Sequence, residues 1–282
     1  MTHPYHSYIA TGMIGLLISI TSATAQEASL ASSAVAPPHS GMKLVWSDEF
    51  SSPTLDFTKW GIEQNGFGGG NQELQLYTDR RENVRVEDGC LVIEARHDHA
   101  SISGTSREFS SGRLRTKHRG DWKYGLIEVR ARLPKGQGIW PAIWMLPTDE
   151  TYGTWASSGE IDIMELRGQT PSVVLGTLHY GGAWPNNQHS GSEYKLASGD
   201  FADEFHTFAV DWREGRMDWW VDDELVQTQT EWTSAGGDYP APFNQRFHLL
   251  LNVAVGGGFS GPPDETTVFP QQMRVDYVRV YQ

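Results

Sequence analysis

Short apolar segments recur along the chain from residue 44 to its last residues, separated by turns rich in Gly, Pro, Asn and Asp. In residues 128–133 (EVRARL) the apolar side chains occupy every second position, which is the period of a strand with one buried face. No window beyond Leu16 places apolar side chains at helical spacing, and Asp222 and Asp223 are typical of a hairpin turn. The pattern predicts strands within residues 44–50, 83–97, 112–117, 124–134, 159–166, 173–180, 206–212, 216–229, 247–256 and 272–282.

This many strands without intervening helices indicates an all-β fold in which antiparallel sheets pack as a sandwich. The length of 282 residues suits one large all-β domain, and the content of 38% hydrophobic and 20% charged residues excludes wholesale disorder. The sequence contains no internal repeat. We therefore expect a single folded domain over residues 42–282.

The N-terminal region differs in composition from the rest of the chain. Residues 9–20 (IATGMIGLLISI) form one apolar stretch, and Ala23-Thr24-Ala25 then matches an A-x-A cleavage site. We predict a signal peptide over residues 1–25 and a linker of Ala, Ser and Pro over residues 26–41, in a protein that is secreted or periplasmic. The segment before the apolar stretch contains no Lys or Arg, so an N-terminal membrane anchor is the alternative.

Acidic residues outnumber basic ones by 35 to 22, which gives a formal net charge of −13 at pH 7. This balance argues against nucleic acid, because binding a phosphate backbone requires clustered Lys and Arg. It also argues against sulfated and other anionic polymers. Eleven Trp exceed the needs of one core, so we expect some of them on a surface as stacking platforms. The single cysteine, Cys90, is expected to be a buried packing residue and has no partner for an intramolecular disulfide.

The segment GEIDIMEL contains three carboxyl groups among apolar side chains. In a regular strand Glu160 and Asp162 share one face, and Glu165 points to the other. A β-bulge at Ile163-Met164 would add one residue and return Glu165 to the first face. A row of like charges costs stability, which favours a functional explanation. The alternatives are a charged edge strand that blocks aggregation and a calcium site.

Two carboxyl groups that face one bond at about 5–5.5 Å are the catalytic groups of a retaining glycosidase. We expect Glu160 to be the ionised nucleophile, and Glu165 to be the general acid. Neighbouring negative charge and partial burial would raise the pKa of Glu165 and keep it protonated. Asp162 would hydrogen-bond Glu160 and adjust its charge. Once Glu160 is esterified its charge is gone, so Glu165 would become more acidic and serve as the base toward water.

The segment E-I-D-I-M-E resembles the signature E-[IL]-D-x-x-E of glycoside hydrolase family 16, the laminarinase and β-glucanase family. The resemblance extends from about Leu44 to Tyr281 and implies a concanavalin-like jelly-roll sandwich whose concave face forms a glycan cleft. Further segments that resemble the family, in its order, are W-S-D-E-F (46–50), G-x-N-Q-E-L-Q-x-Y-T (69–78), D-G-x-L-V-I-E-A (88–95), S-G-R-L-R-T-K (111–117), G-x-W-P-A-x-W-M-L (138–146) and L-N-V-A-V-G-G (251–257).

The expectation about the substrate depends on Met164, the inserted residue before the second glutamate. Members of the family with this insertion are typically 1,3-β-glucanases, whereas the mixed-linkage lichenases usually have a regular E-I-D-I-E strand. The resemblance therefore implies retaining endo-hydrolysis of β-1,3-glucan. The alternatives are a lichenase that cuts mixed 1,3-1,4-glucan, an agarase or carrageenase, and a non-catalytic glycan-binding sandwich, which would need no paired acids.

Five further residues resemble positions of the family that bind sugars. Trp140 and Trp144 lie on one face of a strand and resemble its stacking tryptophans, with core packing as the alternative. Asn71 and Arg115 resemble residues that hydrogen-bond sugars on the non-reducing side of the cut, and a surface salt bridge is the alternative for Arg115. His179 resembles a histidine near the general acid and the leaving-group sugar, and a structural role is its alternative.

Other tryptophans are assigned from their positions in the chain. Trp155, five residues before Glu160, and Trp184 are expected to line the cleft. Trp219 and Trp220 are consecutive and must face opposite ways in a strand, so at least one of them should pack in the interior.

A calcium site is implied only by the resemblance to the family. The same resemblance implies that the chemistry needs no cofactor. Many members of the family hold one Ca²⁺ on the convex face, and Glu49, Gly89 and Asp276 are the corresponding positions here, with backbone carbonyls contributing at the first two. Oxygen donors of this kind suit Ca²⁺. We expect a monomer that binds a neutral β-glucan, with no nucleic acid partner and no membrane association after the signal peptide is removed.

Overall fold

The computed structural model describes residue 39 and residues 41–282, and nearly all regular structure in this part of the chain is β-strand. The predicted signal peptide and nearly all of the predicted linker lie outside the described residues. The strands are β1 (Leu44–Asp48), β2 (Gly61–Ile62), β3 (Gln75–Tyr77), β4 (Val84–Glu87), β5 (Cys90–Ile102), β6 (Thr105–Ser111), β7 (Arg113–Arg115), β8 (Asp121–Trp122), β9 (Gly125–Arg132), β10 (Ile139–Pro147), β11 (Glu160–Leu166), β12 (Val173–Gly181), β13 (Asn187–Lys195), β14 (His206–Arg213), β15 (Arg216–Val221), β16 (Glu224–Gln229), β17 (Phe247–Val255) and β18 (Gln271–Tyr281).

Only two short helical segments interrupt the strands in the described residues, the 3-10 turn η1 (Gly68–Gly70) and the helix α1 (Gly257–Ser260). Neither of these, nor any other described segment, is a helix with the length and hydropathy to cross a bilayer.

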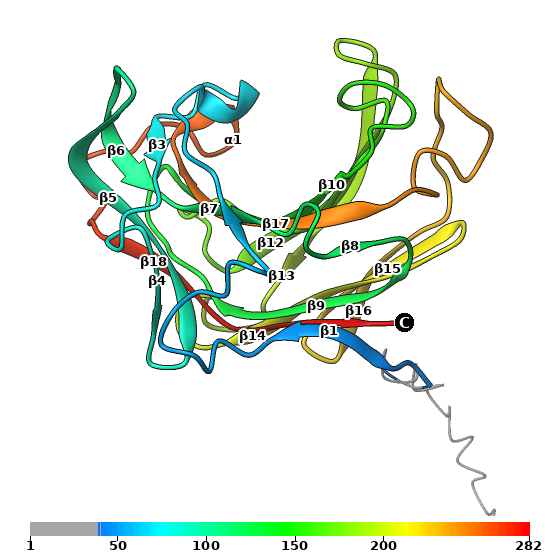
Figure 1. Cartoon of the computed structure of the whole chain (residues 1–282), viewed down its shortest axis with the longest axis horizontal. Coiled ribbons are helices and arrows are strands. Elements are labelled where there is room, and N and C mark those ends of the chain that lie inside the picture. The colour runs from blue at the N-terminus through cyan, green and yellow to red at the C-terminus, as the bar shows by residue number, and fades with distance from the viewer. Residues whose placement is uncertain (1–38, 40) are drawn as a thin grey trace, which may run out of the picture. The chain divides into compact units, whose positions relative to one another are not determined.

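The strands form two sheets that pack face to face. One sheet has the order β16-β15-β14-β9-β18-β5-β6-β3, with β1 added to β18 and β4 added to β5. The other has the order β13-β12-β11-β10-β17-β7-β2, with β8 added to β17. Figure 1 shows both as curved layers, with β10, β17 and β7 in the inner one. The predicted all-β sandwich is confirmed, and its strands pair antiparallel except for β3 with β6.

The core lies between the two sheets and follows the alternation of the strands. On β9 the side chains of Ile127, Val129 and Ala131 are fully buried in this core. On β17 the same alternation sends Phe247, Leu249, Leu251, Val253 and Val255 into the core. The intervening residues of β17, which include a histidine and an asparagine, therefore point to the other face of the inner sheet.

Two consecutive tryptophans of β15 pack on opposite faces of their sheet, which confirms that at least one of them is internal. Trp219 belongs to the main core, and its indole N–H donates to the carbonyl oxygen of Asp162 on the other sheet at 2.9 Å. Trp220 packs in a small separate cluster with Leu126 and Ala209. β12 passes so close to Trp219 that a Cβ at Gly176 would lie 2.5 Å from the indole ring, so only glycine fits there.

The predicted bulge in β11 is present. Against its neighbour β12, β11 advances three residues, from Asp162 to Glu165, while β12 advances two, from Thr177 to Leu175. The extra residue falls at Ile163-Met164. β11 lies between β10 and β12, which contradicts the edge-strand alternative for its acidic residues.

Candidate active site

Three carboxyl groups of β11 converge on the face of the inner sheet that points away from the core. Asp162 is buried, and Glu160 and Glu165 are half-buried on either side of it. Their charges act on one another, because Asp162 raises the pKa of Glu160 and Glu165 raises the pKa of Asp162. The bulge therefore produces the single row that alternation alone would not allow. We call Glu160, Asp162 and Glu165 the acid row.

Each glutamate of the acid row accepts a hydrogen bond from a tryptophan. The indole N–H of Trp155 donates to Glu160 Oε2 at 2.6 Å, and that of Trp140 donates to Glu165 Oε1 at 3.0 Å. In both glutamates the second carboxyl oxygen is left for other partners. Sequence reasoning expected these tryptophans to bind sugars and did not anticipate that they orient the two acids.

His179 lies opposite Glu160 on β12 and faces the acid row. Its Nε2 is 3.3 Å from Asp162 Oδ2, in ion-pair range although not aligned as a hydrogen bond, and 3.9 Å from Glu160 Oε1. Its shortest contacts are thus with these two acids, although the sequence suggested a place near Glu165. The ring also packs between Trp155 and His189, at centroid distances of 5.6 and 5.7 Å.

The same residues form the one group of three or more potential metal ligands found in the described chain. One donor atom each from Glu160, Asp162 and His179 lies within 4.8 Å of the others. A set with an imidazole nitrogen suits a transition metal better than Ca²⁺. This composition disfavours the calcium alternative for the acid row.

Burial changes the protonation of the acid row. Burial and the charge of Asp162 raise the pKa of Glu160 to about 8. Burial also raises the pKa of Asp162 well above its usual range, and burial raises the pKa of Glu165. The sequence predicted a raised pKa for Glu165 and an ionised Glu160, whereas burial raises the pKa of both glutamates. Before substrate binds, the three groups share fewer than three negative charges at neutral pH.

Trp144 extends the floor of the site along β10. Its indole N–H donates to Asn252 Oδ1 at 2.7 Å, and the guanidinium of Arg113 lies 4.7 Å from its ring centre. Trp140 is more deeply placed, at 9% exposure, and packs against Phe259. Asn252 and Arg113 were not identified from the sequence, although both occur in segments that resemble the family.

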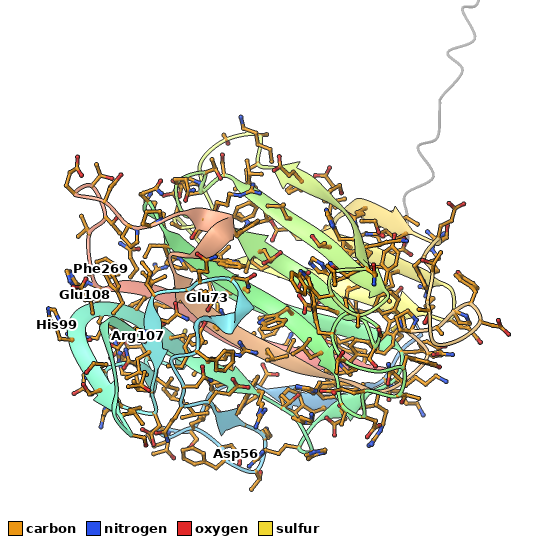
Figure 2. All side chains as sticks on the ribbon, turned by 90° about the horizontal axis from the view of Figure 1, so that it is seen from above. Asp56, Glu73, His99, Arg107, Glu108 and Phe269 are labelled. Atoms are coloured by element: carbon orange, nitrogen blue, oxygen red, sulfur yellow. The ribbon has the colours of Figure 1, made fainter. Side chains whose placement is uncertain are left out.

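Asn71 lies on a segment that is anchored beside α1. Its carbonyl oxygen accepts from the N–H of Gly258 at 2.9 Å. Two residues on, the buried carboxylate of Glu73, which Figure 2 labels, accepts from Gln75 and Tyr77, at 2.7 and 3.3 Å. The Asn71 side chain is exposed, and it does not line the main cavity described next.

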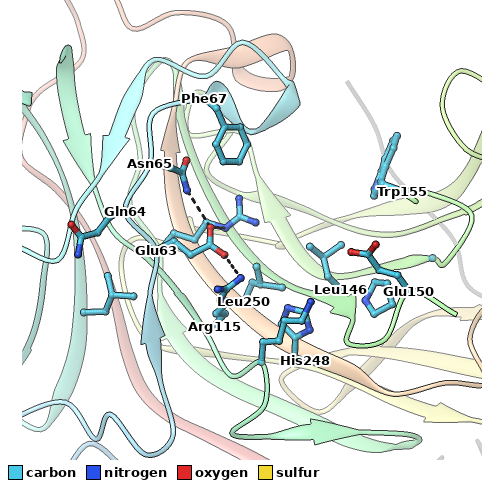
Figure 3. A pocket seen from close by; sticks show the side chains of 15 residues that line it. Glu63, Gln64, Asn65, Phe67, Arg115, Leu146, Glu150, Trp155, His248 and Leu250 are labelled. Carbon is cyan, nitrogen blue, oxygen red and sulfur yellow. Dashed lines mark hydrogen bonds and ion pairs between the residues drawn. The ribbon is translucent and has the colours of Figure 1, made fainter. Parts of the chain in front are cut away.

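A cavity of about 530 Å³ opens between Trp155, whose indole N–H binds Glu160, and the loop before η1 (Figure 3). Its lining includes Gly159, the residue before Glu160, but no residue of the acid row. Arg115 lines it and is also paired with Glu63 at 3.3 Å, so it contributes both to the cleft wall and to a salt bridge. The full lining is Ile62, Glu63, Gln64, Asn65, Phe67, Arg113, Arg115, Lys117, Leu146, Pro147, Glu150, Trp155, Gly159, His248 and Leu250. Trp184 is 73% exposed and is not part of this lining.

The three positions suggested for calcium lie on the other sheet, away from the acid row. β18 pairs with β5 as far as Val275 and with β1 from Val278, and Asp276 lies where the partner changes. Gly89 is in the turn that leads into β5, and Glu49 directly follows β1. Neighbouring strands therefore bring the three positions to one part of this sheet.

Both carboxylates at these positions already face guanidinium groups. Asp276 Oδ2 is 2.6 Å from Arg130 Nη1, and Glu49 binds Arg279 through both oxygens, at 3.0 and 2.8 Å. Cys90, the residue after Gly89, is buried, and burial raises the pKa of its thiol, as expected of a packing residue.

Comparison with known proteins assigns the chain to a family. Residues 71–279 match the model described as glycosyl hydrolases family 16. The chain is similar to a glucan endo-1,3-beta-glucosidase A1 of Niallia circulans, with 45% identity over 263 residues; the match covers 87% of this chain and 38% of that relative.

Two other matches cover their counterparts almost completely. A glucan endo-1,3-beta-glucosidase of Cryptopygus antarcticus is 41% identical over 252 residues, which cover 86% of this chain and 92% of the relative. The X-ray structure of the laminarinase from Rhodothermus marinus superposes with a TM-score of 0.76 at 44% identity, and covers 86% of this chain and 97% of that one. With the acid row, the sandwich and these matches together, the chain belongs to glycoside hydrolase family 16.

Proposed function

We propose that this protein is a retaining endo-hydrolase of β-1,3-glucan. The observation that carries the proposal is the acid row, in which each of the two glutamates accepts a hydrogen bond from its own tryptophan. The relatives named as endo-1,3-beta-glucosidases and laminarinase support the same activity. A non-catalytic glycan-binding protein would gain nothing from the electrostatic cost of the acid row.

In the proposed reaction Glu160 Oε1 attacks the anomeric carbon of the sugar at the cut. Trp155 holds Oε2, so the carboxylate presents its other oxygen to the substrate. As the bond to the leaving sugar breaks, Glu165 donates a proton to the departing oxygen, and a covalent ester forms at Glu160. Trp140 holds Glu165 Oε1 and so orients the carboxyl group for this transfer.

Water completes the reaction with the roles of the acids reversed. The ester at Glu160 carries no charge, so Glu165 can give up its proton easily and now acts as a base. It takes a proton from water while the water oxygen attacks the anomeric carbon and releases Glu160. Two displacements at the same carbon restore the β configuration.

Asp162 and His179 position the nucleophile in this scheme. Asp162 lies between the glutamates, and its charge raises the pKa of Glu160. His179, whose Nε2 lies 3.9 Å from Glu160 Oε1, has the opposite effect and lowers the pKa of Glu160. The ionisation of Glu160 thus depends on the balance between these two neighbours.

The proposed linkage rests on the inserted Met164 and on the resemblance to the 1,3-β-glucanases of the family. A neutral polymer is compatible with a net charge of −13 and with tryptophans along the floor. We assign the cut to 1,3-linked chains, and mixed 1,3-1,4-glucan is the competing substrate.

The first prediction concerns product and substrate. NMR of the first products from laminarin should show the β-anomer, which later mutarotates, because each of the two displacements inverts the anomeric carbon and two inversions restore its configuration. Turnover of laminarin should exceed that of lichenan. An initial α-anomer would overturn the assigned mechanism, while a preference for lichenan would overturn only the linkage.

The second prediction concerns the two glutamates. Glu165→Gln should lower kcat by about 10²–10⁴-fold, because the leaving oxygen loses its proton donor. Glu160→Gln should lower kcat by several orders of magnitude, and azide should restore turnover to Glu160→Gly by attacking in its place. Circular dichroism should show all variants folded. Glu82→Gln, at an exposed turn, is the control and should retain full activity; near-normal turnover by either active-site Gln variant would contradict the roles.

The third prediction concerns pH and stability. Glu160 has a pKa of about 8 in the folded protein, against an ordinary value of 4.5, so the folded state binds its proton more tightly than the unfolded state. Glu160 therefore lowers stability increasingly as the pH rises from about 4.5 to about 8. Glu160→Gln removes this effect, so its Tm should exceed that of the wild type by an amount that grows over this range.

Calorimetric scans at several pH values measure this difference in Tm between the variant and the wild type. A change of 1 kcal/mol in the free energy of unfolding shifts the Tm by about 2–4 °C. Glu82→Gln should show no such growth. A Tm difference for Glu160→Gln that is constant with pH would mean that burial does not disfavour the Glu160 charge.

We also propose a structural calcium at Glu49, Gly89 and Asp276, remote from the acid row. The carbonyl oxygens of the first two and the carboxylate of Asp276 are hard donors that suit Ca²⁺. Because Asp276 contacts Arg130, a bound ion would have to displace that guanidinium. The ion would stabilise the fold and take no part in the chemistry.

The fourth prediction tests this ion. Added to chelated protein, Ca²⁺ at a hundredfold excess over its Kd should stabilise the fold by about 2.7 kcal/mol and raise the Tm. Asp276→Asn should reduce the shift, and Asp264→Asn, an exposed acid elsewhere, should retain it. The kcat at low temperature should stay the same. Absence of any shift at saturating Ca²⁺ would exclude the site.

The biological setting is part of the proposal. The A-x-A site at Ala23-Thr24-Ala25 supports export with removal of the signal peptide, to the periplasm or beyond the cell. An acidic protein of this kind would act on its polymer as a monomer, without a protein partner.

A further inference from the structure

Phe67 is one of the most exposed large apolar side chains in the described chain, at 69% exposure. It lies immediately before η1, at the upper edge of the cavity and across from Trp155 (Figure 3). Because the Phe67 ring stays in water, it contributes no burial of apolar surface to the stability of the fold. Its position at the rim of a cleft lined by aromatic and polar groups suggests a surface on which a ligand lies.

The backbone that carries Phe67 is fixed. Asn65 exchanges two backbone hydrogen bonds with Tyr77, at 3.2 and 2.8 Å. Gly66 packs so tightly that a Cβ there would lie 2.8 Å from Leu76 Cδ1, and its carbonyl accepts from Arg107 Nη2 at 2.5 Å. The ring is therefore presented from an anchored loop.

A second hollow begins on the far side of Phe67. Its volume is about 450 Å³, and it shares Gln64, Asn65 and Phe67 with the main cavity. It then continues over the hairpin of β5 and β6, where Ile102, Ser103, Thr105 and Arg107 line it. Figure 2 shows Arg107 on this side of the molecule, next to the segment that leads to Glu73. Phe67 is thus the boundary between two adjoining hollows.

We propose that Phe67 and the second hollow form a distal subsite for the glucan chain whose other end occupies the active-site cleft. The proposal rests on the proposed function, because a polymer cut internally must extend beyond the residues that perform the cut. The occupant follows from continuity: the two hollows share three lining residues, and a linear chain leaving the first passes over Phe67 into the second. The chemistry agrees, since a ring face packs on sugar C–H groups and Gln64, Asn65 and Ser103 can hydrogen-bond hydroxyls.

The subsite has a distinct kinetic consequence. A short oligosaccharide held at the acid row, none of whose residues lines either hollow, does not extend as far as Phe67, whereas a long chain that also runs through the main cavity does. Binding energy from this remote contact lowers the barrier measured by kcat/KM only for chains that make it. Phe67 is therefore expected to make the enzyme favour longer chains, without touching the reacting atoms.

The experiment compares wild type, Phe67→Ala, Phe67→Trp and Phe57→Ala on laminaritriose, laminariheptaose and laminarin. Phe57 is a matched control, with 64% exposure and no place in either hollow. Phe67→Ala should lower kcat/KM about 3- to 10-fold on the heptaose and laminarin and leave the triose unchanged, as expected for one aromatic contact. Phe67→Trp should restore the values, and Phe57→Ala should match the wild type on every substrate.

Other results of these kinetic measurements would contradict the distal subsite or the proposed function. Equal losses on the triose and the heptaose would mean that Phe67 acts on the active site itself, and no loss on any substrate would mean that the chain does not cross it. Either result would overturn the distal subsite while leaving the glucanase activity in place. Wild-type protein that cuts neither laminarin nor its oligosaccharides would overturn the proposed function, and the occupant named here with it.

Discussion

Between Asp162 and Glu165, β11 contains one residue more than the stretch of β12 paired with it, and the acid row exists because of that extra residue. In a regular strand Glu165 would point into the core, where Ile161 and Leu166 are fully buried and no polar partner is available to a carboxyl group. With the bulge, all three acids face the cleft. Burial, and for Glu160 and Asp162 also the charge of a neighbouring acid, raises the pKa values of the three groups, a cost that the apolar core between the two sheets must offset.

The sandwich and the acid row can be predicted from the sequence because both depend on local order. Alternation over a few residues indicates a strand, and the spacing of E-I-D-I-M-E limits which acids share a face. The orienting roles of Trp140 and Trp155 depend instead on tertiary contacts, one of them between positions 25 residues apart. The protonation states cannot be predicted from the sequence either, because they depend on burial. Both glutamates are desolvated, so a raised pKa does not distinguish the nucleophile from the general acid.

A neutral substrate brings no charge with which to balance the acid row. The number of protons on it is therefore decided by the protein alone, through burial, through His179 and through the mutual repulsion of the three acids. This arrangement suits a reaction that needs one carboxylate and one carboxylic acid at the start and exchanges their states midway. Affinity has to come from other contacts, which aromatic surfaces such as Trp144 can supply without adding charge.

Trp219 reaches from the outer sheet through the core to the carbonyl of Asp162, and Gly176 leaves room for it to pass. The strand that bears the acids is thereby fastened to the layer behind it, at the residue just before the bulge. Local fraying of the active site would require breaking a buried hydrogen bond and disturbing the packing of an indole that is 2% exposed. Adaptation to different chains is therefore left to the loops at the rim, and the catalytic centre loses its geometry only when the two layers separate.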